Sequence, residues 1–365
     1  MAPLSLGQEL ALAAVKVLVI FGALLGVFSG MTYVERRALA FMQFRLGPNR
    51  TGPWGILQPV ADGIKLFFKE ESIPEGANVW LFFLAPAVSV VTAFLAIAVV
   101  PYGGSITLPN WVKLPTWLWP GWLRGREITL QIADLDVGLL FIFAITALGV
   151  YGVVMAGWAS NNKYTLIGGL RSSAQMFSYE LALVLSLVGV IMLASSFRIQ
   201  DIVTSQAGWF FPNWNMFRQF PAFVVYVIAA TAEVNRTPFD LPEAETELVA
   251  GFHTEYSSMK FALLQMAEYV NMITVAAVGT NIFLGGWNSG LPLLPSSGLF
   301  GVVWFSLKAL LVLFFFIWLR GTLPRLRYDQ LMHFGWKVLV PVAAVWILVT
   351  AGYMAFIPPA RTAGL

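Results

Sequence analysis

Long apolar runs that are almost free of charge constrain this chain more than any other feature. Residues 79–100 and 299–319 are two such runs, and a helix of about twenty apolar residues crosses roughly 30 Å of hydrocarbon. Of the 365 residues, 58% are hydrophobic and only 11% are charged, whereas a soluble chain carries roughly a quarter of charged residues. The composition therefore excludes a soluble globular enzyme. A net charge of +3 is too small to indicate a nucleic-acid partner.

The apolar runs predict an all-α, polytopic integral membrane protein with about eight transmembrane helices. We treat the chain as a single membrane domain, 1–365. The predicted spans are 17–34, 79–100, 137–157, 174–194, 221–235, 259–283, 299–319 and 336–357. An amphipathic helix on the inner side is predicted at about 58–70, and an acidic inner loop at 236–258.

Lysines and arginines favour one set of alternate loops. The loops that we place inside hold Arg36, Arg37, Arg45, Arg50, Lys65, Lys69, Lys163, Arg171, Arg236, Lys260, Arg320, Arg325, Arg327 and Lys337. The opposite loops hold only Lys113, Arg124, Arg126, Arg198, Arg218 and Arg361. Because positively charged loops stay in the cytoplasm, this bias predicts that both termini lie outside. Lys16 and Lys308 fall within or beside spans.

The first inner loop contains the predicted amphipathic helix. Val60, Ile64 and Phe67 fall on one helical face, and Asp62 and Lys65 fall on the other. Such a helix lies in the membrane interface. With the arginines that precede it, it could anchor the chain to lipid headgroups, form the mouth of a cavity for an amphiphile with an apolar tail, or bind an acidic partner.

Three carboxylates remain inside the predicted spans, namely Glu180, Glu233 and Glu268. An ionisable group within a membrane is costly and marks a functional site by default. Each one alone could be an interior hydrogen-bonding group or a partner of Lys308. Three together favour a polar, hydrated path.

The acidic loop adds five more carboxylates, Asp240, Glu243, Glu245, Glu247 and Glu255. Two prolines, Pro238 and Pro242, predict the end of one helix and the start of a short one, with Asp240 and Glu243 in a capping-box spacing. Glu243 and Glu247 would share a face as like charges, which raises their affinity for protons. A proton-coupled device needs such a cluster.

The chain has no cysteine, so it holds no thiolate zinc site or iron–sulfur cluster of its own. Its two histidines, His253 and His333, form no metal-ligand motif, and we predict no metal site. Any redox centre that it serves belongs to another chain. The Gly22-x-x-x-Gly26-x-x-x-Gly30 stripe predicts close approach of another helix.

Several long motifs resemble those of one family. They read ERR at 35–37, RLGPNR at 45–50, QPVADGIK at 58–65, FKE at 68–70, AEVNRTPFDLPEAE at 232–245, GFHTEY at 251–256, MAEY at 266–269 and RYDQ at 327–330. Together they resemble the H-type membrane subunit of the proton-pumping NADH:quinone oxidoreductase, respiratory complex I, along nearly the whole chain.

The resemblance implies a membrane subunit that forms the quinone-access chamber and the start of the proton path. The quinone, ubiquinone or a relative, would be its substrate. The chamber or its portal would use Arg36, Phe44, Arg45, Asp62, Lys65, Phe239, Arg320 and Arg325. The proton path would use Glu180, Glu233, Glu243, Glu245, Glu247, Glu255 and Glu268.

The resemblance also implies partners and a location. FMN and iron–sulfur clusters would lie on partner subunits of the peripheral arm, and small and antiporter-like subunits would adjoin the chain in the bilayer. The membrane would be the inner (plasma) membrane of a bacterial cell, with the acidic and basic loops in the cytoplasm. The chain alone would then catalyse nothing.

One departure and two alternatives stay open. Some relatives have a further acid in the third helix, where 137–157 has none and Ala147 lies near its middle, so water or another subunit would have to bridge that step. The same scaffold could serve a ferredoxin- or F420-fed dehydrogenase or a membrane-bound hydrogenase. A stand-alone proton-coupled transporter is disfavoured because we find no internal repeat.

Overall fold

The computed structural model describes residues 5–107, 127–208, 213–241, 249–291, 294–295 and 298–356. Within these ranges seven helices are long and apolar enough to cross a membrane. They are α1 (Leu6–Met42), α3 (Val79–Ile97), α4 (Gly138–Ala159), α5 (Lys163–Ala194), α10 (Ser258–Phe283), α11 (Leu299–Thr322) and the continuous helix Tyr328–Phe356. The predicted span 221–235 is the shorter helix α8 (Phe220–Glu233). The all-α, polytopic fold is confirmed.

Two helices extend further than their apolar runs. α1 has 37 residues and is therefore about 56 Å long, almost twice the roughly 30 Å of a bilayer core. α5 begins at Lys163, not near 174, because Asn162 caps it by accepting a 3.0 Å hydrogen bond from the backbone N–H of Tyr164. Apolar length alone missed these extensions, since polar residues continue both helices.

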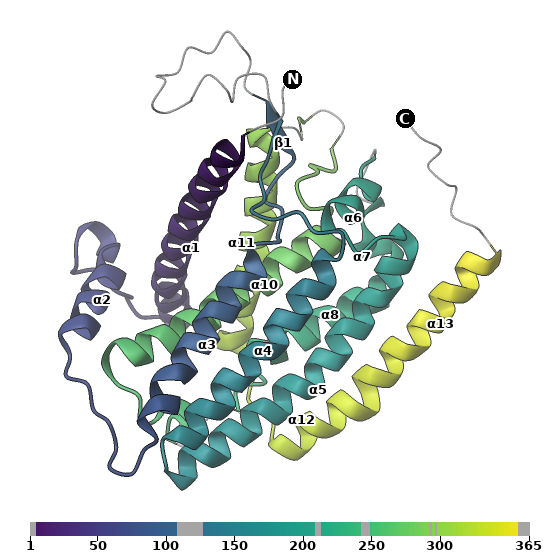
Figure 1. The fold of residues 1–365 in the computed structure, drawn as a ribbon. Coiled ribbons are helices and arrows are strands. Elements are labelled where there is room, and N and C mark those ends of the chain that lie inside the picture. Colours follow the sequence, from purple (N-terminus) through teal and green to yellow (C-terminus); the bar gives the residue numbers. More distant parts are fainter. Residues whose placement is uncertain are drawn as a thin grey trace.

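Shorter elements close the two ends of the bundle. One end, which we call the terminal end, holds the start of α1, the end of α13 (Val340–Phe356), and the helices α6 (Ile199–Ser205) and α7 (Asn215–Arg218) (Figure 1). It also holds β1 (Ser105–Thr107), which pairs antiparallel with β2 (Glu127–Thr129). The opposite end, which we call the basic end, holds α2 (Gln58–Phe68) and α12 (Tyr328–Phe334). Helix α1 thus starts at the same end at which α13 finishes.

The core lies among α3, α4, α5, α8 and α10, which pack side by side. α1 and α13 lie at opposite edges of the bundle (Figure 1). Only 6% of the apolar window of α1 is buried, against 61% for α10. α10 is therefore the central helix, and α1 is held by few contacts.

The amphipathic helix is confirmed as α2, with Pro59 in its first turn. It has no buried residue, so Val60, Ile64 and Phe67 present an uncovered apolar face. The Gly22, Gly26 and Gly30 stripe is also uncovered, since a Cβ built at each glycine meets no atom within 4 Å. The predicted close approach of another helix is not made within the described chain.

Pro86 in the middle of α3 creates a specific link to the basic end. A proline has no N–H, so the carbonyl of Phe82, four residues earlier, has no helical donor. The hydroxyl of Tyr256 donates to that carbonyl at 3.2 Å, and the two rings stack at 4.1 Å. Burial raises the pKa of Tyr256, which keeps this donor protonated.

Glycines allow α4 and α5 to approach closely. A Cβ at Gly157 would lie 2.7 Å from the carbonyl oxygen of Thr165 and 3.2 Å from the Cα of Gly169. Both obstacles are backbone atoms, which cannot rotate away. This crossing brings the polar face of α5 against its neighbours.

We expect Gly157→Ala to destabilise the protein by about 1–3 kcal/mol through overpacking. The check is the melting temperature of the detergent-solubilised protein. Gly352→Ala in α13 is the matched control, because a Cβ there meets nothing within 4 Å. Equal melting temperatures for the two variants would contradict the close crossing.

Candidate functional site

A buried carboxylate, Glu35, lies at the centre of the most polar cluster. It sits on the extension of α1 and is only 4% exposed. The Nη1 of Arg236 donates to its Oε1 at 3.1 Å, and Arg320 of α11 donates to the same oxygen. Tyr269 of α10 donates to Oε2 at 2.7 Å. Four segments of the chain therefore meet at one carboxylate.

Arg236 reaches this position from a turn that α5 holds in place. The turn follows α8, which ends at Glu233, close to the predicted bound at 235, and Asn235 adopts φ 53° just after it. Gln175 of α5 donates from its Nε2 to the carbonyls of Ala232 at 2.7 Å and Phe239 at 2.6 Å. This buried amide therefore sets the path of the turn.

The charge of Arg236 is stabilised although its guanidinium is buried. Burial by itself lowers the pKa of Arg236, but the Glu35 carboxylate and the groups around it hold that pKa above its usual value. The guanidinium also lies 4.6 Å from the centre of the Tyr269 ring and interacts electrostatically with Glu268. Its Nε and Nη2 have no acceptor among the described residues. A permanent buried positive charge thus stands between two glutamates.

Two further ion pairs surround this cluster at the basic end. Arg325 donates to Asp240 at 2.7 Å, which ties the segment after α11 to the turn after α8. Arg36 donates to Asp62 at 2.5 Å, which ties α1 to α2. The second pair is much more exposed than the first.

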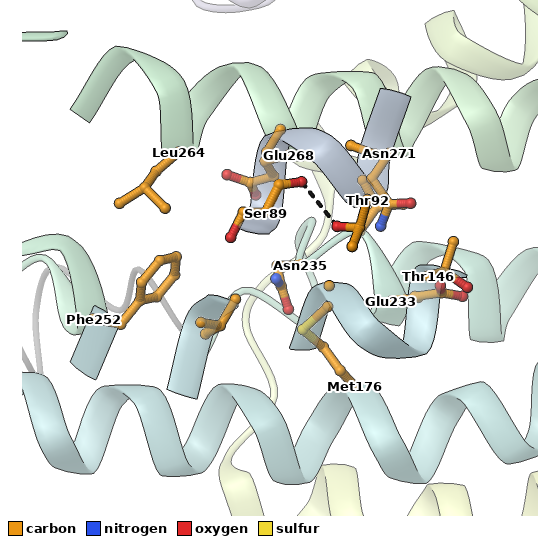
Figure 2. A pocket seen from close by; sticks show the side chains of 15 residues that line it. Ser89, Thr92, Thr146, Met176, Glu233, Asn235, Phe252, Leu264, Glu268 and Asn271 are labelled. Carbon is orange, nitrogen blue, oxygen red and sulfur yellow. Dashed lines mark hydrogen bonds between the residues drawn. The ribbon is translucent and has the colours of Figure 1, made fainter. Parts of the chain in front are cut away.

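A small cavity with several polar groups on its wall lies beside the cluster, among α3, α4, α5, α8 and α10 (Figure 2). Its volume is about 60 Å³, and each water needs roughly 10–15 Å³ of such space. The polar groups on its wall are Ser89, Thr92, Thr146, Glu233, Asn235, Glu268 and Asn271. The cavity therefore has both the room and the hydrogen-bonding groups for a few water molecules.

Two of the three glutamates predicted within the spans line this cavity, and the third interacts with one of them. Glu233 and Glu268 line it, and Glu180 of α5 interacts electrostatically with Glu233. Lys308 is not among their hydrogen-bond partners. It donates instead to the carbonyls of Leu284, Gly286 and Asn288 at 2.6–2.9 Å, where it caps the loop after α10. The alternative that Lys308 neutralises the glutamates is wrong.

Not all of the predicted residues lie in the cluster. Phe44, Arg45 and Lys65 are exposed at the basic end, and Phe239 is buried with its ring 5.3 Å from that of Tyr179. Glu255 accepts a 2.6 Å hydrogen bond from Asn162. Glu243, Glu245 and Glu247, together with the predicted helix start at Pro242, lie outside the described residues.

Residue patterns alone did not single out Glu35, Arg236 or Tyr269. The predicted first span stops at 34, which places Glu35 in a basic loop. Glu35 follows Met31 by one helical turn, and this spacing was a signal in the sequence that the two share a face. Both side chains are buried. The contact to Arg236 spans 201 residues, and no local pattern reveals it.

Comparisons with known proteins agree along nearly the whole chain. The sequence profile described as NADH dehydrogenase matches residues 15–351. The NADH-quinone oxidoreductase H subunit numbered 2 of Geobacter sulfurreducens is 50% identical over 349 residues, which cover 96% of this chain and 98% of that protein. The H subunit numbered 1 of Geobacter metallireducens is 51% identical, with the same coverage. The NADH-quinone oxidoreductase H subunit of Syntrophotalea carbinolica is 49% identical over 94% of this chain and 97% of its own length.

We expect Glu35→Ala to destabilise the protein by about 3–5 kcal/mol, because it leaves the buried Arg236 without its counter-charge. Asp329→Ala is the control, since it breaks the exposed pair with Arg327, and such pairs contribute little. Thermal melting of the solubilised protein measures both. If Glu35→Ala melted at the same temperature as Asp329→Ala, Glu35 would not be the centre of the cluster.

Proposed function

Because this chain belongs to the NADH dehydrogenase family, we propose that it is the membrane subunit of respiratory complex I that forms the quinone-access chamber. We further propose that it starts the acidic path that couples quinone reduction to proton translocation. The relatives are named as subunits of an NADH-quinone oxidoreductase, which favours this complex over a ferredoxin- or F420-fed dehydrogenase or a hydrogenase.

One observation carries the proposal, the series of charged groups that runs from the basic end into the membrane. Arg320 contacts Glu35, which contacts Arg236. Arg236 interacts with Glu268 on the cavity wall. Glu233 lies on the same wall and interacts with Glu180. A purely structural core would not need this many ionisable groups, three of which, Glu35, Arg236 and Glu233, are buried and therefore costly in a membrane.

The proton path would run through the cavity. Protonated carboxylates donate and ionised ones accept, and cavity water would carry protons between Glu268 and Glu233. Thr146 of α4 lies on the cavity wall, so a hydroxyl and water could replace the acid that α4 lacks. Neighbouring carboxylates share protons readily, since like charges disfavour joint ionisation.

The quinone chamber would lie at the basic end, between α1 and the segments after α8 and α11. Arg36 and Asp62 would form its portal where α2 meets α1, with Phe44, Arg45 and Lys65 at the rim. The uncovered apolar face of α2 suits an amphiphile with a long apolar tail. Phe239, Arg320 and Arg325 would line the approach to the Glu35 cluster.

The coupling would be electrostatic. Reduction of a quinone consumes protons as well as electrons, so negative charge developing in the chamber attracts protons from nearby carboxylates. Arg236 and Arg320 hold a fixed positive charge next to Glu35. Through Arg236, a change in charge near Glu35 would alter the electrostatic potential at Glu268. The carboxylates nearest the chamber would give up protons to the quinone and be reprotonated along the glutamate series. Glu243, Glu245, Glu247 and Glu255 would be further members of that series.

This role assigns the electron carriers to other subunits. Peripheral-arm subunits would supply FMN, the iron–sulfur clusters and the deep end of the quinone site, and would bind the basic end. Small and antiporter-like subunits would adjoin the bundle in the bilayer. The membrane would be the inner membrane of a bacterial cell, with the basic end in the cytoplasm.

We expect Glu233→Gln to lower NADH-to-quinone electron transfer and proton pumping together by about tenfold or more, because a proton relay loses a member. Both rates are measured in isolated membranes. Glu127→Gln on β2 is the control, since Glu127 is exposed at the terminal end. Wild-type electron transfer and pumping in Glu233→Gln would rule out the glutamate series.

We expect Arg36→Ala to raise the quinone concentration for half-maximal activity several-fold, with a smaller change in maximal rate, because it removes a portal contact and not a reacting group. Steady-state kinetics with a short-chain quinone measure both. Arg50→Ala is the control, because Arg50 is exposed in the same loop. An unchanged quinone dependence in Arg36→Ala would remove it from the portal.

A further inference from the structure

A second, much larger hollow lies at the other end of the bundle. It is a groove of about 750 Å³ between the terminal-end halves of α1 and α11, backed by α10 and covered by the strands β1 and β2. In Figure 1 these helices lie next to each other at the edge of the bundle. The groove has no part in the proposed proton path or quinone chamber, both of which lie toward the basic end.

The walls of the groove are apolar and its rim faces outward. Leu24, Phe305 and Leu313 form part of its inner surface and are buried. Val15 and Leu310 line it too but are more than half exposed. The groove is therefore open along its side, toward the hydrocarbon of the bilayer.

The part of the groove below Lys16 matches one leaflet. The lining on α1 runs from Ala11 to Val27, about 24 Å at 1.5 Å per residue, and the part below Lys16 is about 17 Å of this. Half of a roughly 30 Å hydrocarbon core is about 15 Å. Below Val27 the two helices belong to one packed cluster that includes Met31, Phe316 and Ile317. A transmembrane helix would need contact along the full thickness, whereas an acyl chain needs only this half.

The groove has a single cation among the described residues, and it lies next to the strand β2. Lys16 lines the groove, and its Nζ donates to the backbone oxygen of Gln131 at 3.0 Å and to the Oγ1 of Thr129 at 3.3 Å. An ammonium has three N–H donors, so one donor remains for a ligand. No acid lines the groove within the described part of the chain, and the charge of Lys16 is therefore complementary to an anion.

We propose that this groove binds one anionic phospholipid of the terminal-end leaflet. Its phosphate accepts a hydrogen bond from Lys16, and one acyl chain fills the space between α1 and α11. The lipid thereby supplies the packing that α1 lacks in this half. Because the opposite half of the same helix carries Glu35, the lipid also steadies the helix that presents the buried carboxylate.

The test uses the assembled complex in vesicles of phosphatidylglycerol that carries a photoactivatable diazirine in one acyl chain. After illumination, mass spectrometry maps the labelled peptides. We expect labelling of the groove segments 11–27 and 299–313, and about tenfold less labelling in Lys16→Met, because a hydrogen bond to a charged group is lost. Ala23→Trp, which fills the groove, should lose the label as well.

Matched variants separate the groove from the general lipid surface. Lys16→Arg should keep the label, and so should Leu18→Trp, because Leu18 is exposed on α1 outside the groove. Wild-type labelling in Lys16→Met and Ala23→Trp would overturn the proposal, as would equal labelling by a phosphatidylcholine probe. Displacement of the label by excess quinone would also overturn it. Labelling of α13 without any labelling of the groove would overturn it too. That result would mean that the probe reaches the protein but that a neighbouring protein of the complex fills the groove.

Discussion

The pairing of Glu35 with two arginines is the interaction on which the rest of the site depends. A carboxylate buried to this degree is tolerated only with counter-charges and hydrogen bonds, and Glu35 obtains them from Arg236, Arg320 and Tyr269. These partners belong to the turn after α8, to α11 and to α10. Since little of the apolar window of α1 is buried, these contacts help to align the helix with the core.

The same pairing determines what the cavity next to it can do. Arg236 keeps its charge and interacts electrostatically with both Glu35 and Glu268, so under the proposed function a change in charge near Glu35 would reach the cavity wall without any large movement. Ser89, Thr92 and Asn271 make the cavity polar, and α3, α4 and α10 keep it narrow. The structure therefore places a fixed charge beside a cavity with room for water, among helices that are otherwise apolar.

The sequence predicted the fold well because membrane helices follow directly from the length of apolar runs; 79–100, for example, became α3, Val79–Ile97. It failed where polar residues continue a helix, as at Glu35 and at the start of α5. It identified Glu233 and Glu268 because an acid inside an apolar span is conspicuous. It could not identify Arg236 and Tyr269 as partners of Glu35, or exclude Lys308 as a partner of the glutamates. Those contacts join distant segments, and only packing decides them.

Under the proposed function, the cavity glutamates change their protonation when the quinone is reduced. Infrared difference spectra of the assembled complex, recorded between oxidised and quinone-reduced states, follow the C=O stretch of protonated carboxyl groups directly. We expect a carboxyl band that changes on reduction in the wild type and in Glu127→Gln, and that is missing in Glu268→Gln. A band of unchanged size and position in Glu268→Gln would contradict it.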